Sequence, residues 1–125
     1  MKDKKGQALF EVVIAIGVIL ILVVALIITA TYSLRNAEFS RSQMLATKYA
    51  QEAIEKIRLF RDNNPWNTFI LQCNSFDLGM NLPSNFSLTR QCFCLSDICE
   101  VKIVINWQDS KGNHKSELTT KITKK

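Results

Sequence analysis

Four cysteines are the side chains of this 125-residue chain that are best suited to chemistry. They occur in the spacing Cys73-x18-Cys92-x-Cys94-x4-Cys99. Four thiolates can bind zinc, but structural zinc sites usually contain C-x2-C pairs, which this spacing lacks. We therefore expect disulfides and no metal or other cofactor, with a zinc site as the alternative.

Four cysteines can pair in three ways. Cys92 and Cys94 are two residues apart in an expected strand, so they share one face but stand too far apart to bridge comfortably. If residues 95–98 form a hairpin loop, Cys94 and Cys99 stand opposite each other. We therefore expect the pairs Cys94–Cys99 and Cys73–Cys92, the longer of which ties an irregular loop to a sheet.

No arrangement of residues suited to catalysis is evident. The one histidine, His114, lies in an expected turn, and neither a Ser/His/Asp arrangement nor a Gly-rich phosphate loop can be built with any specificity. We interpret His114 as a solvated turn residue. The chain is therefore not expected to be an enzyme.

The net charge of +5 is concentrated in part near the C-terminus. The basic residues there are Lys111, Lys115, Lys121, Lys124 and Lys125. Such a cluster can bind nucleic acid or a charged surface. No aromatic residues interleave with these lysines, so a solvated strand edge and tail is the favoured interpretation.

Most of the apolar excess lies in one uncharged run of nineteen residues, Val12–Ala30. As a helix it spans roughly 28 Å at about 1.5 Å per residue, close to the thickness of a bilayer core. Lysines at positions 2, 4 and 5 precede it, and a basic flank stays in the cytoplasm. No A-x-A cleavage site follows the run. We expect a single-pass cell membrane protein whose C-terminal domain lies outside, where disulfides persist.

The residues before the run contain a glycine and one carboxylate. Gly6 follows the basic residues, and Glu11 stands five residues later, at the edge of the apolar run. A charge near hydrocarbon costs about 2.5–3.5 kcal/mol on insertion scales, so it usually has a partner or a role. No residue within the run can pair with Glu11.

The segment Lys5-Gly6-Gln7-Ala8-Leu9-Phe10-Glu11-Val12 resembles the class III signal of type IV prepilins and type II secretion pseudopilins. The resemblance implies that a prepilin peptidase cuts between Gly6 and Gln7, that residues 1–6 are a leader, and that Glu11 becomes the fifth mature residue. The family usually has an N-methylated Phe at the first mature position, where this chain has Gln7. In a stack of subunits, Glu11 of one chain can pair with the new amine of its neighbour. The alternative is an ordinary membrane anchor with an interfacial Glu.

The helical pattern continues beyond the apolar run. Alanines at 46, 50 and 53, with Ile57 and Phe60, recur on one face, and no Gly or Pro occurs from residue 31 to 62. Asn63-Asn64-Pro65 ends the pattern. We predict one helix from near Leu9 to near Asp62, transmembrane over 12–30 and amphipathic over 31–62. A coiled-coil stalk is the alternative for its second half.

The remaining residues, 63–125, predict a small globular domain. Residues 63–87 are rich in turn formers and are expected to be irregular, with aromatic residues packed against the helix. Period-two patterns then predict three antiparallel strands: one from Phe86 to Cys94, one around Val101–Trp107, and one over Ser116–Thr123 after a turn at 109–113. The expected fold is α+β: a long N-terminal helix packed on a three-stranded sheet, as the pilin resemblance also implies.

The resemblance extends into the second half of the helix. Tyr49-Ala50-Gln51-Glu52-Ala53-Ile54-Glu55-Lys56-Ile57-Arg58, followed by Arg61-Asp62-Asn63, is similar to V-type minor pilins and I-type minor pseudopilins. The implied function is a structural subunit of a type IV pilus or a type II secretion-like pseudopilus. The implied partners are other pilins, a prepilin peptidase, an inner-membrane assembly platform and membrane lipid. The alternative is a pilus-tip module that binds DNA or surfaces through the basic C-terminus.

Overall fold

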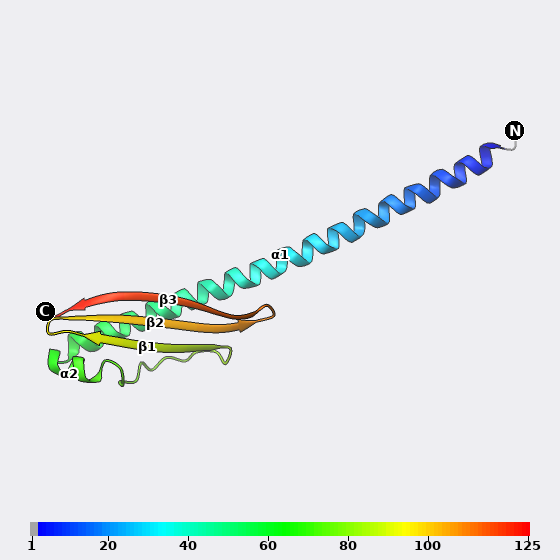
Figure 1. The fold of residues 1–125 in the computed structure, drawn as a ribbon. Helices are drawn as coiled ribbons and strands as arrows, with labels where there is room; N and C mark the ends of the chain where they lie inside the picture. The colour runs from blue at the N-terminus through cyan, green and yellow to red at the C-terminus, as the bar shows by residue number, and fades with distance from the viewer. Residues whose placement is uncertain (1–2) are drawn as a thin grey trace. The chain divides into compact units, whose positions relative to one another are not determined.

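The computed structural model describes residues 3–125, and the side chains of residues 6–125. Met1 and Lys2, at the start of the expected leader, lie outside the described residues. The elements are α1 (Asp3–Asn63), α2 (Trp66–Gln72), β1 (Phe86–Cys94), β2 (Ile98–Asp109) and β3 (Gly112–Thr123), shown in Figure 1. The chain divides into two compact units, Met1–Glu38 and Phe39–Lys125, and α1 contributes to both. The expected α+β fold is confirmed.

Helix α1 begins earlier than the sequence predicted. It starts at Asp3 and not near Leu9, because Lys, Gln and Ala are good helix formers and no Pro stops the helix in this region. It ends at Asn63, close to the expected position. Pro65 follows, and the Asn64 side chain donates a hydrogen bond of 2.8 Å to the carbonyl of Phe60, which would otherwise lack an intrahelical partner.

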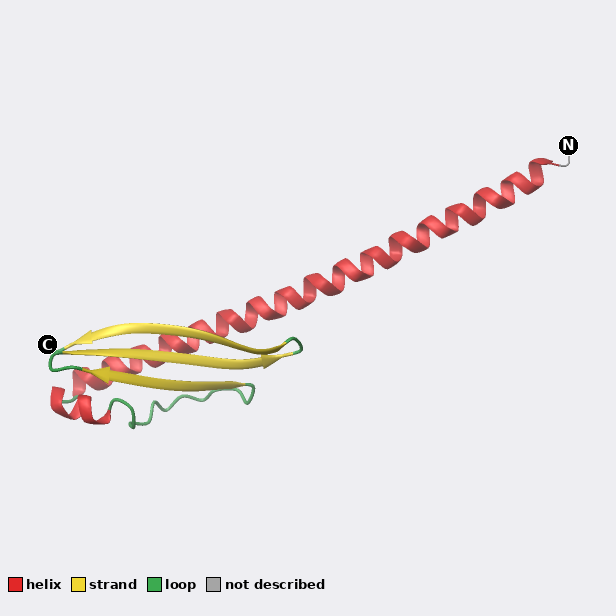
Figure 2. Ribbon diagram, in the orientation of Figure 1, coloured by secondary structure: helices red, strands yellow, loops and turns green. Residues whose placement is uncertain are grey.

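The three strands form an antiparallel meander in the order β1-β2-β3 (Figure 2). The predicted third strand was too short, because β3 begins at Gly112 and not at Ser116. The turn contains only two residues, and the register pairs Asp109 with Gly112 directly. The Asp109 Oδ1 atom accepts a 2.7 Å hydrogen bond from the Lys111 N–H, and Gly112 has a φ of +127°, which favours glycine.

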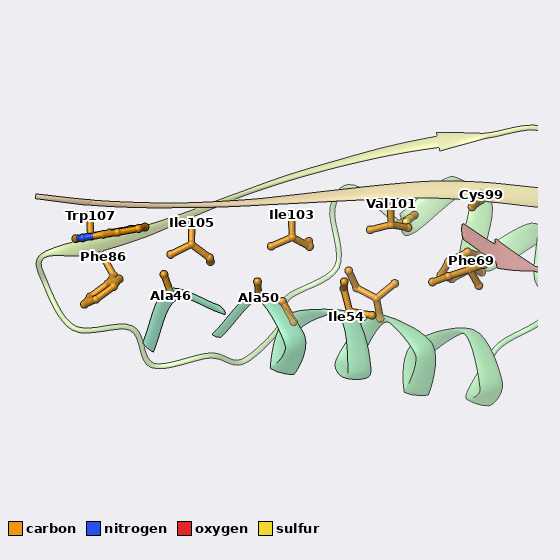
Figure 3. Packing of buried hydrophobic residues seen from close by; sticks show 14 residues of the cluster. Ala46, Ala50, Ile54, Phe69, Phe86, Cys99, Val101, Ile103, Ile105 and Trp107 are labelled. Carbon is orange, nitrogen blue, oxygen red and sulfur yellow. The ribbon is translucent and has the colours of Figure 1, made fainter. Parts of the chain in front are cut away.

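The core of the second unit lies between the amphipathic part of α1 and one face of the sheet (Figure 3). Ala46, Ala50 and Ala53 are fully buried on the helix, and their small side chains let the sheet approach its backbone. The facing strand β2 contributes side chains that are also fully buried: Val101, Ile103 and Ile105. The expected packing of helix on sheet is confirmed, and the stripe does not form a coiled-coil stalk within this chain.

The segment that was expected to be irregular contains the short helix α2. Pro65 precedes it, and its carbonyl accepts a 3.0 Å hydrogen bond from the N–H of Phe69. Phe69 and Cys73 stand one turn apart and are both fully buried. The aromatic residues of this region pack on the core as predicted: Phe76 stacks on Phe60 with ring centroids 4.0 Å apart. The prediction of an irregular segment was therefore wrong at residues 66–72.

Candidate functional site

The three residues of the expected processing and assembly site lie together near the start of α1. Gly6, Gln7 and Glu11 are all exposed, and the i,i+4 spacing places Gln7 and Glu11 on one face of the helix. Among residues 6–125, whose side chains are described, none forms an ion pair with Glu11. Its carboxylate is therefore available to a group outside these residues.

The apolar run leaves its side chains exposed. Every large aliphatic side chain from Leu9 to Leu34 is at least 45% exposed. Burying a Val, Leu or Ile side chain gains roughly 1.5–3 kcal/mol, so exposure of this whole surface to water is energetically unfavourable. Helix α1 is long and apolar enough to cross a membrane, which is compatible with a single-pass membrane protein.

Gly6 has no structural need to be glycine in this fold. A Cβ atom built at Gly6 meets nothing within 4 Å, and the same holds at Gly17, further along the helix. A side chain at either position therefore leaves the packing of α1 unchanged. This makes Gly17 a matched control for Gly6 in experiments on processing.

Both expected disulfides are present in the second unit. Cys73 bridges Cys92 and Cys94 bridges Cys99, so no free thiol remains for zinc among the cysteines. Cys94 and Cys99 are direct cross-strand neighbours at the end of the β1–β2 hairpin, as predicted. The longer bridge joins the residue after α2 to β1. It therefore holds the loop that precedes β1 against the sheet.

Arg90 reinforces that loop, and sequence reasoning missed it. Its Nη2 atom donates to the carbonyls of Asn74 (2.9 Å) and Phe76 (2.8 Å), and its guanidinium lies 4.5 Å from the centre of the Phe76 ring. Its Nε and Nη1 atoms are buried without a hydrogen-bond partner in the described part of the chain. Burial lowers the pKa of Arg90. The available signal was its parity, since Arg90 falls between Leu88 and Cys92 on the inward-facing side of the β1 alternation.

We predict that Arg90→Leu lowers the free energy of unfolding of the second unit by about 2 kcal/mol, because the carbonyls of Asn74 and Phe76 lose a charged donor, the latter in a partly buried position. Urea unfolding of the detergent-solubilised chain, followed by tryptophan fluorescence, measures the change. Arg90→Lys keeps the charge but cannot donate from a planar fork, so its urea midpoint should lie between those of wild type and Arg90→Leu. An unchanged urea midpoint in Arg90→Leu would contradict a stabilising role.

The C-terminal lysines do not form one patch. They extend from the turn before β3 to the residues after it, and β3 alone is roughly 40 Å long at about 3.3 Å per residue. Lys115 pairs with Glu117 and Lys125 pairs with Asp62, each at 3.0 Å. The hydrogen bond from Lys125 lowers the pKa of Asp62. This arrangement gives weak support to a nucleic-acid site.

His114 is not a solvated turn residue. It lies in β3, and its Nε2 atom is 2.9 Å from the Oδ1 atom of Asp109. Its ring packs against those of Phe39 and Trp107, with centroids 5.0 and 5.6 Å away. Burial raises the pKa of Asp109, but hydrogen bonds from the Lys111 N–H and from His114 outweigh it, so the net pKa is lowered. The histidine therefore closes the β2–β3 end of the core.

Within the described residues, no three His, Cys, Asp or Glu side chains gather to hold a metal ion. In comparisons with known proteins, no family model, no curated protein and no solved structure matches this chain.

Proposed function

We propose that this chain is a minor pilin or pseudopilin, a structural and non-catalytic subunit of a type IV pilus or a type II secretion-like pseudopilus. The observation that carries the proposal is the first part of α1. There, an exposed apolar run follows Gly6 and a single carboxylate, Glu11, that has no ion-pair partner among residues 6–125. Bilayer lipid covers this run before assembly, and the helices of neighbouring subunits cover it in the filament.

Processing supplies the group that Glu11 needs. A prepilin peptidase that cuts after Gly6 creates an α-amino group on Gln7, which the same machinery can N-methylate. In a helical stack, the amine of one subunit lies beside Glu11 of the next. In a medium of low dielectric, such a pair has a much larger interaction energy than in water. An inner-membrane assembly platform then moves each subunit from the membrane into the stack.

A pilus-tip module that binds DNA or a surface is the second candidate function. This candidate rests on the lysines near the C-terminus. Two of them, Lys121 and Lys124, form no ion pair with any described residue. The spread of the lysines along β3 and the pairing of Lys115 and Lys125 make this candidate weaker than assembly.

Co-expression with a prepilin peptidase tests the proposal. We expect N-terminal sequencing of the product to begin at Gln7, and mass spectrometry of the same peptide to report whether its amine is methylated. Gly6→Val should block the cut because a branched side chain replaces the residue at the scissile bond. Gly17→Val, which has the same open surroundings, should leave processing unchanged. A product that still begins at Met1 or Lys2 would overturn the proposal.

A further inference from the structure

The two edges of the sheet differ in how their main-chain groups are satisfied. At the β1 edge, the Asn74 side chain accepts a 2.8 Å hydrogen bond from the N–H of Cys92 and donates one of 3.3 Å to its carbonyl. Asn74 therefore satisfies both main-chain groups of Cys92 at this edge. At the β3 edge, no described residue forms such a bond with any outward-facing group from Asn113 to Lys121.

Strand geometry shows which groups of β3 face its open edge. The carbonyl of Thr123 accepts a 3.3 Å hydrogen bond from Arg61, so Thr123 points away from β2. In an antiparallel ladder, this orientation alternates along the strand. The N–H and C=O groups of Lys121, Thr119 and Glu117 therefore face the edge as well. They form a row of unsatisfied donors and acceptors that fits one more strand.

A hollow lies beside this edge, on the side of the sheet that packs against α1. Its volume is ≈ 400 Å³. It is lined by Gln51, Ile54, Glu55, Arg58, Leu118, Thr119 and Thr120. Ile54 is buried and Leu118 is half-buried, so part of the lining is apolar. A strand added to β3 would direct every second side chain toward this hollow, which has room for apolar side chains.

The charges along the edge favour an acidic partner. Glu117 is already paired with Lys102 and Lys115, each at 3.0 Å. Lys121 stands opposite Glu100 in the sheet register but forms no ion pair with any described residue, and neither does Lys124. Positive charge therefore remains near the end of β3. Opposite charges across neighbouring strands stabilise their pairing, whereas like charges oppose it.

We propose that the β3 edge binds an extended segment of a partner protein as a fourth, antiparallel strand. The segment has an apolar residue opposite Leu118, which enters the hollow, and an acidic residue opposite Lys121. Main-chain hydrogen bonds to Thr119 and its outward-facing neighbours provide affinity, and the two side-chain positions provide specificity. The residues of this surface all belong to the second unit, and none belongs to the apolar run of α1 through which subunits are proposed to stack.

A fluorescent peptide, Glu-Val-Thr-Val-Lys-Val-Glu, tests the proposal with the full chain in detergent micelles. Paired antiparallel with residues 115–121, it places Glu opposite Lys121 and Val opposite Leu118. The matched control peptide, Lys-Val-Thr-Val-Glu-Val-Lys, keeps the apolar residues and reverses the charges. Fluorescence anisotropy should show saturable binding of the first peptide that is about tenfold tighter than that of the second, a difference of about 1.4 kcal/mol.

Variants of the β3 edge distinguish peptide binding as a fourth strand from nonspecific adsorption of the peptide to the protein. Thr119→Pro removes an outward N–H that the fold does not use, so peptide binding should weaken by about tenfold or more. Thr119→Val keeps the N–H and should bind as wild type does. Lys121→Glu should narrow the difference in affinity between the two peptides, because the charge pair at position 121 changes sign while those at Glu117 and Lys115 do not. This variant keeps the test valid if Thr119→Pro loses its near-ultraviolet circular dichroism.

Three results would overturn the inference: no saturable binding by the wild-type chain, equal binding of both peptides, or undiminished binding by a folded Thr119→Pro. A fourth such result would come from light scattering, which measures the oligomeric state of the chain. Dimerisation of the peptide-free chain that Thr119→Pro abolishes would assign the edge to a second copy. Processing at Gly6 is measured independently, so failure here leaves the proposed function standing.

Discussion

Glu11→Ala should deplete the chain from sheared filaments, or from cross-linked complexes with other pilins, while leaving it in the membrane. The apolar run is long enough to insert without Glu11, and removing a carboxylate makes insertion easier. What is lost is the partner of a neighbour's new α-amino group. That amine then enters the subunit stack without a compensating charge, at a cost of several kcal/mol where the site is dry. Fractionation and immunoblotting of the filament and membrane fractions measure both outcomes.

Two further variants isolate the charge as the cause. Glu11→Gln keeps the shape and hydrogen-bonding capacity but not the charge, so it should assemble as poorly as Glu11→Ala. Glu38→Ala removes the next acidic residue along α1, which is also exposed, and should assemble normally. Assembly of Glu11→Gln at the wild-type level would count against the charge pair. Loss of membrane insertion in Glu11→Ala would instead assign Glu11 to topology.

The features that the sequence predicted well are those that repeat. The alternation in β2, from Val101 to Trp107, identified its buried face, because a period of two in a strand allows only one assignment of faces. The alanine stripe of α1 identified the helix face that covers the sheet in the same way. The disulfide pairing followed from one further step, the position of the loop between Cys94 and Cys99.

Short or single features were missed because they do not repeat. Helix α2 has seven residues and is rich in Trp, Thr, Phe and Ile, which favour strands, so tertiary packing of Phe69 decides its conformation. Arg90 is one polar residue in an apolar pattern, and its acceptors lie on a loop whose path cannot be derived from the sequence. The His114–Asp109 contact depended on a two-residue turn that was predicted too long.

Loss of the Cys73–Cys92 bridge should destabilise the second unit, Phe39–Lys125, more than loss of the Cys94–Cys99 bridge. The two close loops of 19 and 5 residues, respectively. In the chain-entropy model these loops correspond to about 3 and about 2 kcal/mol, respectively. The longer bridge also fixes the loop that carries Asn74, whose side chain bonds both main-chain groups of Cys92. A domain with so small a core has only a few kcal/mol of net stability. Loss of the Cys73–Cys92 bridge should therefore remove a large share of that stability.

The double variants Cys73→Ala/Cys92→Ala and Cys94→Ala/Cys99→Ala make the comparison fair. Each truncates one fully buried cysteine, Cys73 or Cys99, so the cavity cost is similar in both. Urea unfolding without reductant should place the midpoint of the first variant below that of the second, and both below wild type. With excess reductant, the three midpoints should converge, because the constraint on the unfolded chain is then absent from all of them. A second variant as unstable as the first would show that the hairpin bridge, and not the loop bridge, limits the stability of this unit.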